Sequence, residues 1–173
     1  GVVTPPLGGD LDFSGSTFRI QDLRVIPGQA EIALRTRGPL TAVLSLLDEK
    51  PFQYLSKAGQ VVTLGQGDAV VTTKLAMPLK KVILPTDVTT QVVADIYDVT
   101  SQVLVPGQVL RSPKLQVFVD NQGLSITGQG RLADMPFDGS FRQDFAKGAR
   151  PQTTANVTIT DAGMRSLGIT LPQ

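Results

Sequence analysis

The feature that most constrains this chain is an alternation of apolar and polar residues that runs through its second half. Successive residues of a strand point to opposite faces of a sheet, so this alternation predicts strands with one apolar and one water-facing side. Antiparallel sheets commonly carry the pattern. The apolar positions, some of them occupied by glycine, are Leu115, Val117, Val119, Leu124, Ile126, Gly128, Gly130, Leu132, Met135, Phe137, Gly139, Phe141, Ala155, Val157 and Ile159.

Short polar connections separate these strands. Asn121-Gln122-Gly123 predicts a hairpin loop in which glycine is available for positive φ, and Ala133-Asp134 predicts a tight link. The strand period also runs through residues 68–77 and 88–97. Consecutive strands joined in this way form a meander. The sequence therefore predicts a mainly β fold, a curved antiparallel meander sheet that makes an open groove or half-barrel.

Two stretches carry the helical period instead. Within residues 39–58, Leu and Val side chains recur at i, i+3, i+4 and i+7, which predicts one short helix and a second after Pro51. Near the C-terminus, Asp161 suits the N-cap of a helix over residues 162–167. Residues 1–16 carry neither period and are predicted to be irregular. We expect one or two short helices on a single β-rich segment that spans residues 1–173.

The composition argues against catalysis. The chain has no Cys and no His, so it lacks thiolate nucleophiles, the usual base of catalytic triads and the commonest transition-metal ligands. Acidic pairs such as Asp95 with Asp98 lie on the polar side of strands, where carboxylates are usually only solvated. The net charge of +1 gives no field that attracts nucleic acid. We therefore expect a protein that is not an enzyme, with no cofactor, no metal and no nucleic-acid partner.

The sheet carries more apolar surface than its helices can cover. About eight strands at ~4.8 Å each give a sheet ~40 Å wide, whereas a helix covers a strip of ~10 Å. Three arrangements cover the remainder: a closed sandwich or barrel, stacking on another module or partner, or an open groove that holds acyl chains. In the third, the predicted groove lining is Leu115, Val117, Val119, Leu124, Ile126, Phe137, Phe141, Ala155, Val157 and Ile159.

Three glycines bear on this choice. Gly128, Gly130 and Gly139 occupy apolar positions of adjacent strands. Glycine inside a strand often marks a bend or a close approach, so three on one face allow sharp curvature and leave room for a ligand. Equally, they provide packing space beneath a large neighbour such as Phe141.

The order of these features resembles the AsmA-like superfamily and, within it, the YhdP-type periplasmic lipid-transport proteins. The resemblance rests on three segments: residues 37–51, from Arg37-Gly38-Pro39-Leu40 through Leu46-Leu47-Asp48 to Pro51; residues 124–145, with Gly128-Gln129-Gly130-Arg131-Leu132; and residues 161–168. With the predicted strand pair that precedes and ends at the first segment, the resemblance covers about residues 17–171. The chain begins at Gly1 and not at Met, which predicts a segment of a longer protein or a processed chain.

The resemblance implies a periplasmic segment of a larger protein, anchored to the inner membrane of a Gram-negative cell through a segment outside these residues. It implies an envelope-spanning conduit in which an apolar β-sheet face shelters phospholipid acyl chains, with the rest of the polypeptide and other envelope proteins as further partners. The alternative is a structural or adhesion module, a β-sandwich with a closed core and no lipid.

Overall fold

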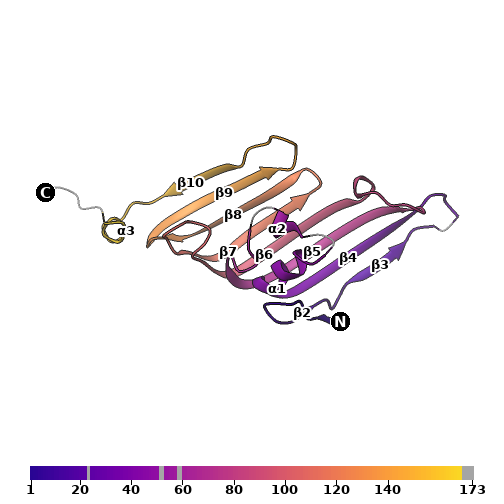
Figure 1. Ribbon diagram of the computed structural model, residues 1–173, viewed down its shortest axis with the longest axis horizontal. Coiled ribbons are helices and arrows are strands. Elements are labelled where there is room, and N and C mark those ends of the chain that lie inside the picture. The colour runs from indigo at the N-terminus through magenta and orange to yellow at the C-terminus, as the bar shows by residue number, and fades with distance from the viewer. Residues whose placement is uncertain (23, 51–52, 58–59, 169–173) are drawn as a thin grey trace.

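One antiparallel sheet forms the body of the molecule. The computed structural model describes residues 1–22, 24–50, 53–57 and 60–168. Each long strand lies antiparallel to the strand before it, and the sheet does not close into a barrel (Figure 1). The predicted meander is confirmed. Its long strands are β4 (Gly28–Pro39), β5 (Gln66–Leu79), β6 (Thr89–Ser101), β7 (Leu110–Asp120), β8 (Gly123–Leu132), β9 (Met135–Asp144) and β10 (Gln152–Val157).

The N-terminal residues are more ordered than predicted. β1 (Val2–Val3) and β2 (Leu11–Asp12) interrupt residues 1–16, which were expected to be irregular, and β3 (Thr17–Ile20) follows that stretch. β2 and β3 both pair with the outer edge of β4. Leu11 is fully buried, because residues 7–11 pass over the start of the first helix. A two-residue strand leaves no periodic pattern, so the alternation did not reveal it.

The described residues include three short α-helices. These are α1 (Leu40–Leu47), α2 (Tyr54–Lys57) and α3 (Asp161–Ser166), and a 3₁₀ turn η1 (Pro85–Asp87) precedes β6. The N-cap of α3 is Thr160 and not the predicted Asp161, since the Thr160 hydroxyl accepts a hydrogen bond from the Gly163 amide at 3.0 Å. No helix in the described part of the chain has the length and apolarity needed to cross a bilayer.

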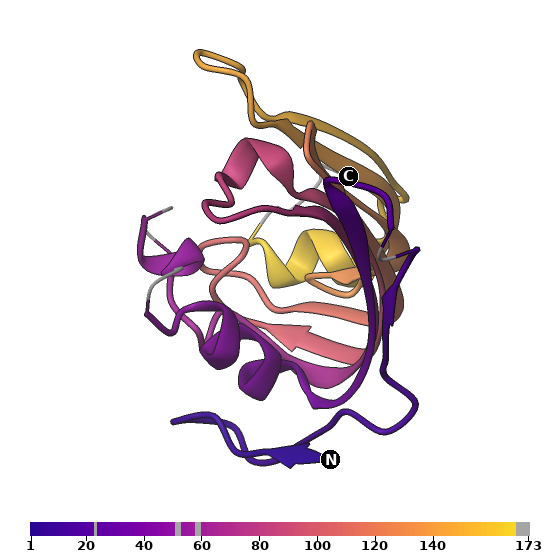
Figure 2. The same ribbon diagram turned by 90° about the vertical axis from the view of Figure 1, so that its right-hand side faces the viewer.

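The strand register places the apolar residues on one face. Directly paired residues of neighbouring strands share a face of the sheet. Val71 lies opposite Ala94, Ala94 opposite Val117, Val117 opposite Ile126, and Ile126 opposite Phe141. This row crosses five strands without a polar residue. The sheet is curved, and α1 and α2 lie inside the curve (Figure 2). Because Val43 of α1 packs against Val71 and Ala94, the apolar face is the concave one.

The buried core is small and lies mostly in the first half of the chain. Of the ten buried apolar residues in the described ranges, nine precede residue 100, and the tenth is Met135. The nine lie on the early strands, on the helices that cover them and on the N-terminal segment: Leu11, Ala30, Leu40, Ala42, Leu55, Ala69, Val71, Ala94 and Val99. The described residues form one sheet and not the two stacked sheets of a sandwich.

Candidate functional site

Nine of the ten predicted lining residues lie on the concave face. The register pairs Val117 with Ile126 and Val119 with Leu124, and it pairs Phe137 with Val157. The nine positions therefore form a continuous apolar surface over β7, β8, β9 and β10. They are Leu115, Val117, Val119, Leu124, Ile126, Phe137, Phe141, Ala155 and Val157. The tenth, Ile159, lies beyond the end of β10 and is 70% exposed, so the register does not assign it to this face.

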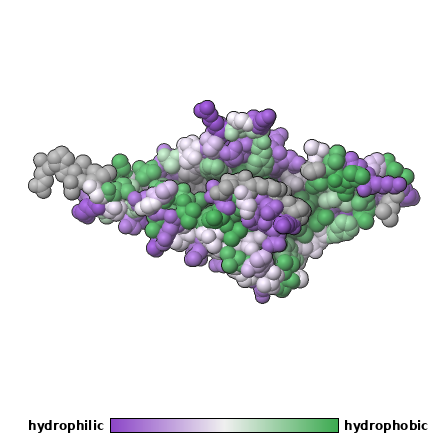
Figure 3. Space-filling view, viewed as in Figure 1, coloured by the Kyte–Doolittle hydropathy of each residue, from purple (hydrophilic) through white to green (hydrophobic). Residues whose placement is uncertain are grey.

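This surface is only partly buried. The seven lining residues on β7 to β9 are half-buried, whereas Ala155 and Val157 on β10 are exposed. Helix α1 packs against β4, β5 and α2. Figure 3 views the side of the sheet that carries α1, and it shows apolar side chains on both flanks of the helical region. The lining residues are partly buried by their neighbours in the sheet, and the concave face above them is open to solvent.

The glycines of the lining serve different purposes. A Cβ added to Gly130 meets the Arg111 carbonyl oxygen at 2.2 Å and the Phe137 ring at 2.8 Å. At Gly128 the added atom meets Leu115 Cδ2 at 2.5 Å. These two glycines therefore provide packing space, beneath Phe137 and Leu115 and not beneath Phe141. Gly139 is less crowded, since its nearest contact is the Thr154 carbonyl oxygen at 3.2 Å.

The concave face extends further toward the N-terminus than the predicted lining. Val92 pairs with Val119, and Ile96 pairs with Leu115, so both continue the same surface onto β6. The alternation through residues 88–97 contained this signal. Val92 and Val117 both pack against the core cluster that α1 covers. The open part of the surface and the helix-covered part therefore meet at β6 and β7.

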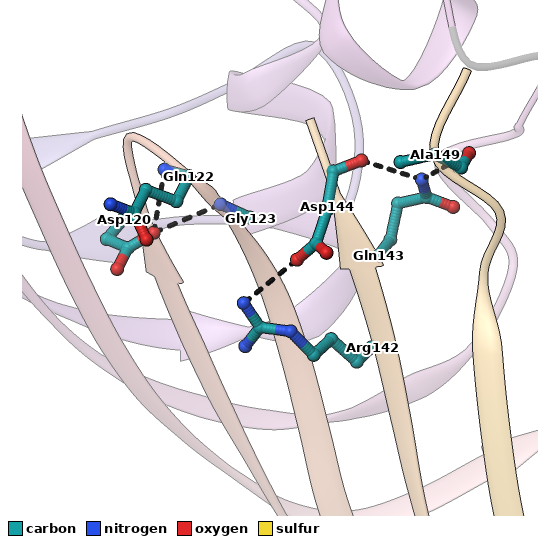
Figure 4. A network of polar contacts seen from close by, with 7 residues as sticks. All are labelled: Asp120, Gln122, Gly123, Arg142, Gln143, Asp144 and Ala149. Atoms are coloured by element: carbon teal, nitrogen blue, oxygen red, sulfur yellow. Dashed lines mark hydrogen bonds and ion pairs between the residues drawn. The ribbon is translucent and has the colours of Figure 1, made fainter. Parts of the chain in front are cut away.

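A network of polar contacts lies at the β7–β8 hairpin and the end of β9 (Figure 4). Asp120 Oδ1 accepts hydrogen bonds from the backbone amides of Gln122 at 2.8 Å and Gly123 at 3.0 Å, which fixes the β7–β8 hairpin. Gln143 pairs with Leu124 and so belongs to the concave face, where its Nε2 donates to the Asp144 carbonyl at 2.8 Å. On the other face, the Arg142 guanidinium lies 2.8 Å from Asp144 Oδ1. The apolar surface therefore ends in a polar rim.

The titrating carboxylates with shifted pKa values lie away from the lining. Hydrogen bonds from the Ser14 hydroxyl and amide lower the pKa of Asp12, and those from Ser56 lower the pKa of Asp48. Lys80 and the Leu84 amide lower the pKa of Asp87. Asp95, one of the predicted acidic pair, lies 3.4 Å from Lys114 Nζ on the outer face. These carboxylates fasten turns and strands, and none of them faces the apolar surface.

Two cavities lie outside the lining. One of about 420 Å³ lies between the N-terminal segment and the start of β5, beside Gly8, Thr41 and Gly67. Another of about 290 Å³ lies beside Arg111, Ser112 and Arg131. Neither contains a residue of the predicted lining. An apolar ligand of the concave face would therefore lie along an open surface and not inside one of these cavities.

Comparison with known proteins adds no relative: no protein-family model, curated protein or solved structure matches the chain. The resemblance to the AsmA-like superfamily rests on its three sequence segments alone. The positions of those segments in the fold are now clear. Residues 37–50 contain the end of β4 and α1, residues 124–145 contain most of the β8–β9 hairpin, and residues 161–168 contain α3, whereas Pro51 lies outside the described residues.

Proposed function

We propose that this chain is a non-catalytic segment of a lipid conduit that shelters phospholipid acyl chains on its concave face. The observation that carries the proposal is the continuous apolar surface over β7 to β10, which the described helices leave uncovered. A contiguous, partly exposed apolar surface on a folded domain often marks a binding site for a protein, a membrane or an apolar ligand. The mechanism is passive and needs no catalytic residue.

Acyl chains suit this surface energetically. Each CH₂ group that leaves water contributes about 0.8 kcal/mol, so an acyl chain gains several kcal/mol even when the sheet covers only one of its sides. The row Val117, Ile126 and Phe141 offers apolar contacts without an intervening polar side chain. A chain that makes only such contacts meets no fixed partner and moves along the row at low cost. The head group stays in water, beside the polar rim at Gln143.

The place of this conduit in the cell comes from the resemblance. The proposal assigns the chain to the periplasm, as part of a longer polypeptide anchored to the inner membrane outside residues 1–173. Phospholipid would then pass between the inner and outer membranes along this face and its continuation in the rest of the protein. Other envelope proteins would be partners at its ends.

A matched pair of substitutions on β8 tests the proposal. Ile126 lies on the concave face, whereas the next residue, Thr127, is exposed on the outer face. Ile126→Asp places a charge within the lining, and Thr127→Asp places the same charge one residue away on the opposite side. With a phospholipid that carries a photoactivatable acyl chain, we expect Ile126→Asp to abolish crosslinking and Thr127→Asp to retain it.

A second pair of variants, on the exposed strand β10, distinguishes a loss of lipid binding from a loss of the fold. Val157 is 42% exposed, so Val157→Asp disturbs no core, and Asn156→Asp is its outer-face control. Circular dichroism establishes that each variant is folded. If both concave-face variants are folded and crosslink as well as their controls, the lipid proposal is wrong, and the structural or adhesion module becomes the better description.

A further inference from the structure

Two arginines face each other on neighbouring strands. The register pairs Arg111 of β7 directly with Arg131 of β8. Directly paired residues share a face of the sheet, and their Cβ atoms lie about 4.5–5.5 Å apart. Arg131 lies between two positions of the apolar face, Gly130 and Leu132, so both arginines belong to the outer face. Like charges directly opposite each other destabilise a strand pair, so an anion between them would stabilise the fold.

The described part of the chain does not provide that anion. Neither guanidinium forms an ion pair with a described residue, whereas Lys114, on the same face of β7, lies 3.4 Å from Asp95. Arg131 Nη2 donates to the backbone carbonyl of Asp134 at 2.8 Å, which orients the side chain but leaves its charge uncompensated. Both arginines are exposed, so a ligand can reach them from solvent.

The arginine pair lines a cavity of about 290 Å³. The register of β7 against β8 shifts between Arg111 and Lys114, which marks a bulge, a feature that often re-aims side chains beside binding and active sites. Thr100 and Ser112 also line the cavity. The Ser112 hydroxyl donates to the Gln129 carbonyl. The donors directed at a ligand are therefore the two guanidiniums and the Thr100 hydroxyl.

We propose that Arg111 and Arg131 together bind the phosphate group of a phosphate monoester. A guanidinium donates two parallel hydrogen bonds to two phosphate oxygens. A phosphate monoester carries nearly two negative charges at neutral pH, which match the two cations, whereas a carboxylate carries one. Asp98 lies in the same lining and opposes the anion, so it weakens binding. The monoester is either free in solution or the head group of a lipid. The site is on the outer face, so the inference does not rest on the lipid conduit.

A matched pair of charge removals tests the site. Arg111→Gln is the cleaner change, because Arg131 also holds the Asp134 carbonyl. Arg35→Gln removes the same charge from the outer face of β4, where Arg35 is exposed and pairs with the uncharged Thr72. Without phosphate, Arg111→Gln should raise the Tm because it relieves the repulsion, and Arg35→Gln should not.

Inorganic phosphate is the first probe, measured against sodium chloride of equal ionic strength. At ten times its Kd, the Tm of the native chain and of Arg35→Gln should rise by about 3–5 °C, because phosphate binds only the folded state. The rise should be several-fold smaller in Arg111→Gln. Equal rises in all three proteins overturn the inference.

An opposite change at Asp98 gives a gain that a merely structural arginine pair does not produce. Asp98→Asn removes the charge that opposes the anion, so titration calorimetry should show phosphate binding several-fold tighter than in the native chain. An unchanged or weaker affinity contradicts the proposed site.

Vesicles of phosphatidylcholine with and without phosphatidic acid distinguish the two sources of the monoester. Cosedimentation that requires phosphatidic acid and is lost in Arg111→Gln assigns the site to a lipid head group. Cosedimentation that is absent, or that Arg111→Gln retains, assigns it to a free monoester. Ile126→Asp, which tests the lipid conduit, should leave the affinity for inorganic phosphate unchanged. Failure of the phosphate site is therefore distinguishable from failure of the proposed function.

Discussion

The two halves of the sheet share one apolar face but cover it differently. Over β4 to β6 the face lies beneath α1, and the N-terminal segment lies against the helix from outside. Over β7 to β10 the same rows of side chains continue, yet their residues are only half-buried or exposed. Met135, which α3 contacts, is the one buried apolar residue in the described part of that half. The two halves therefore differ in their cover, which is the set of helices and loops that pack over the apolar face, and not in their strands.

This contrast separates two sources of stability. The N-terminal half combines ladder hydrogen bonds with a packed core, so its side chains gain both transfer energy and close contact. The C-terminal half relies on its ladder and on cross-strand pairs, which contribute about 0.2–1 kcal/mol each. A half with little core opens locally at lower free energy than one with a core. Its surface is correspondingly available to a ligand.

The largest effect that tests this contrast comes from truncating one leucine in each half. Leu11 is fully buried beside Gly38 of β4, whereas Leu124 is half-buried on the open face. We expect Leu11→Ala to lower the free energy of unfolding by about 3 kcal/mol, and Leu124→Ala by about 1 kcal/mol, because the second leaves no enclosed cavity. Urea unfolding measures both. Equal losses would show that the open face is packed as tightly as the core, which contradicts the comparison.

The strands were predictable from sequence, but the cover was not. Alternation assigned Ile126, Phe141 and Val157 to one face correctly, because the period of a strand is two whatever lies above it. It gave no information about which residues a loop covers. Leu47 is the last member of the predicted stripe at i, i+3, i+4 and i+7, yet it is 42% exposed, whereas Ala42 and Ser45, which are not in the stripe, are buried.

The reason is that α1 packs on two sides. Val43 packs against the sheet, and the N-terminal segment lies along another side of the helix. There the Leu7 amide donates to Ser45 Oγ at 3.2 Å, and Gly8 approaches the helix so closely that an added Cβ would lie 2.3 Å from the Ala42 amide nitrogen. Small residues at i and i+3 permit that contact. Such a contact joins positions more than thirty residues apart, which a local periodicity does not record.

A smaller effect distinguishes the glycines of the open face. An added methyl group at Gly130 collides with the Arg111 backbone, whereas at Gly139 its nearest contact is 3.2 Å away. We expect Gly130→Ala to lower the free energy of unfolding by about 2 kcal/mol, in the range for overpacked sites. Gly139→Ala should change it by less than about 1 kcal/mol, because the strain is smaller and alanine restricts the unfolded chain. Thermal or urea unfolding compares the two. A larger loss at Gly139 would mean that the uncrowded glycine is the one that sets the curvature.

The smallest expected effect is a pH-dependent change in stability at the contact between α1 and α2, the helices of the N-terminal half. The Ser56 hydroxyl and amide of α2 donate to Asp48 at the end of α1, and these bonds hold the pKa of Asp48 below its ordinary value of 3.8. A carboxyl group with a lowered folded pKa stabilises the fold above its ordinary pKa, and that contribution is lost as the pH falls through the lowered value.

Ser56→Ala removes the hydroxyl donor, so the pKa of Asp48 should rise toward its ordinary value in an NMR titration. The variant should have a slightly lower Tm than the native chain at neutral pH, and this difference should shrink as the pH falls and the Asp48 carboxylate takes up a proton in both proteins. Ser140→Ala on the exposed outer face of β9 is the control, and its Tm difference should not depend on pH. If the Ser56→Ala difference is also independent of pH, the charge of Asp48 does not hold α2 against α1. The cover of the N-terminal half then depends on the buried Leu55 and not on this hydrogen-bonded carboxylate.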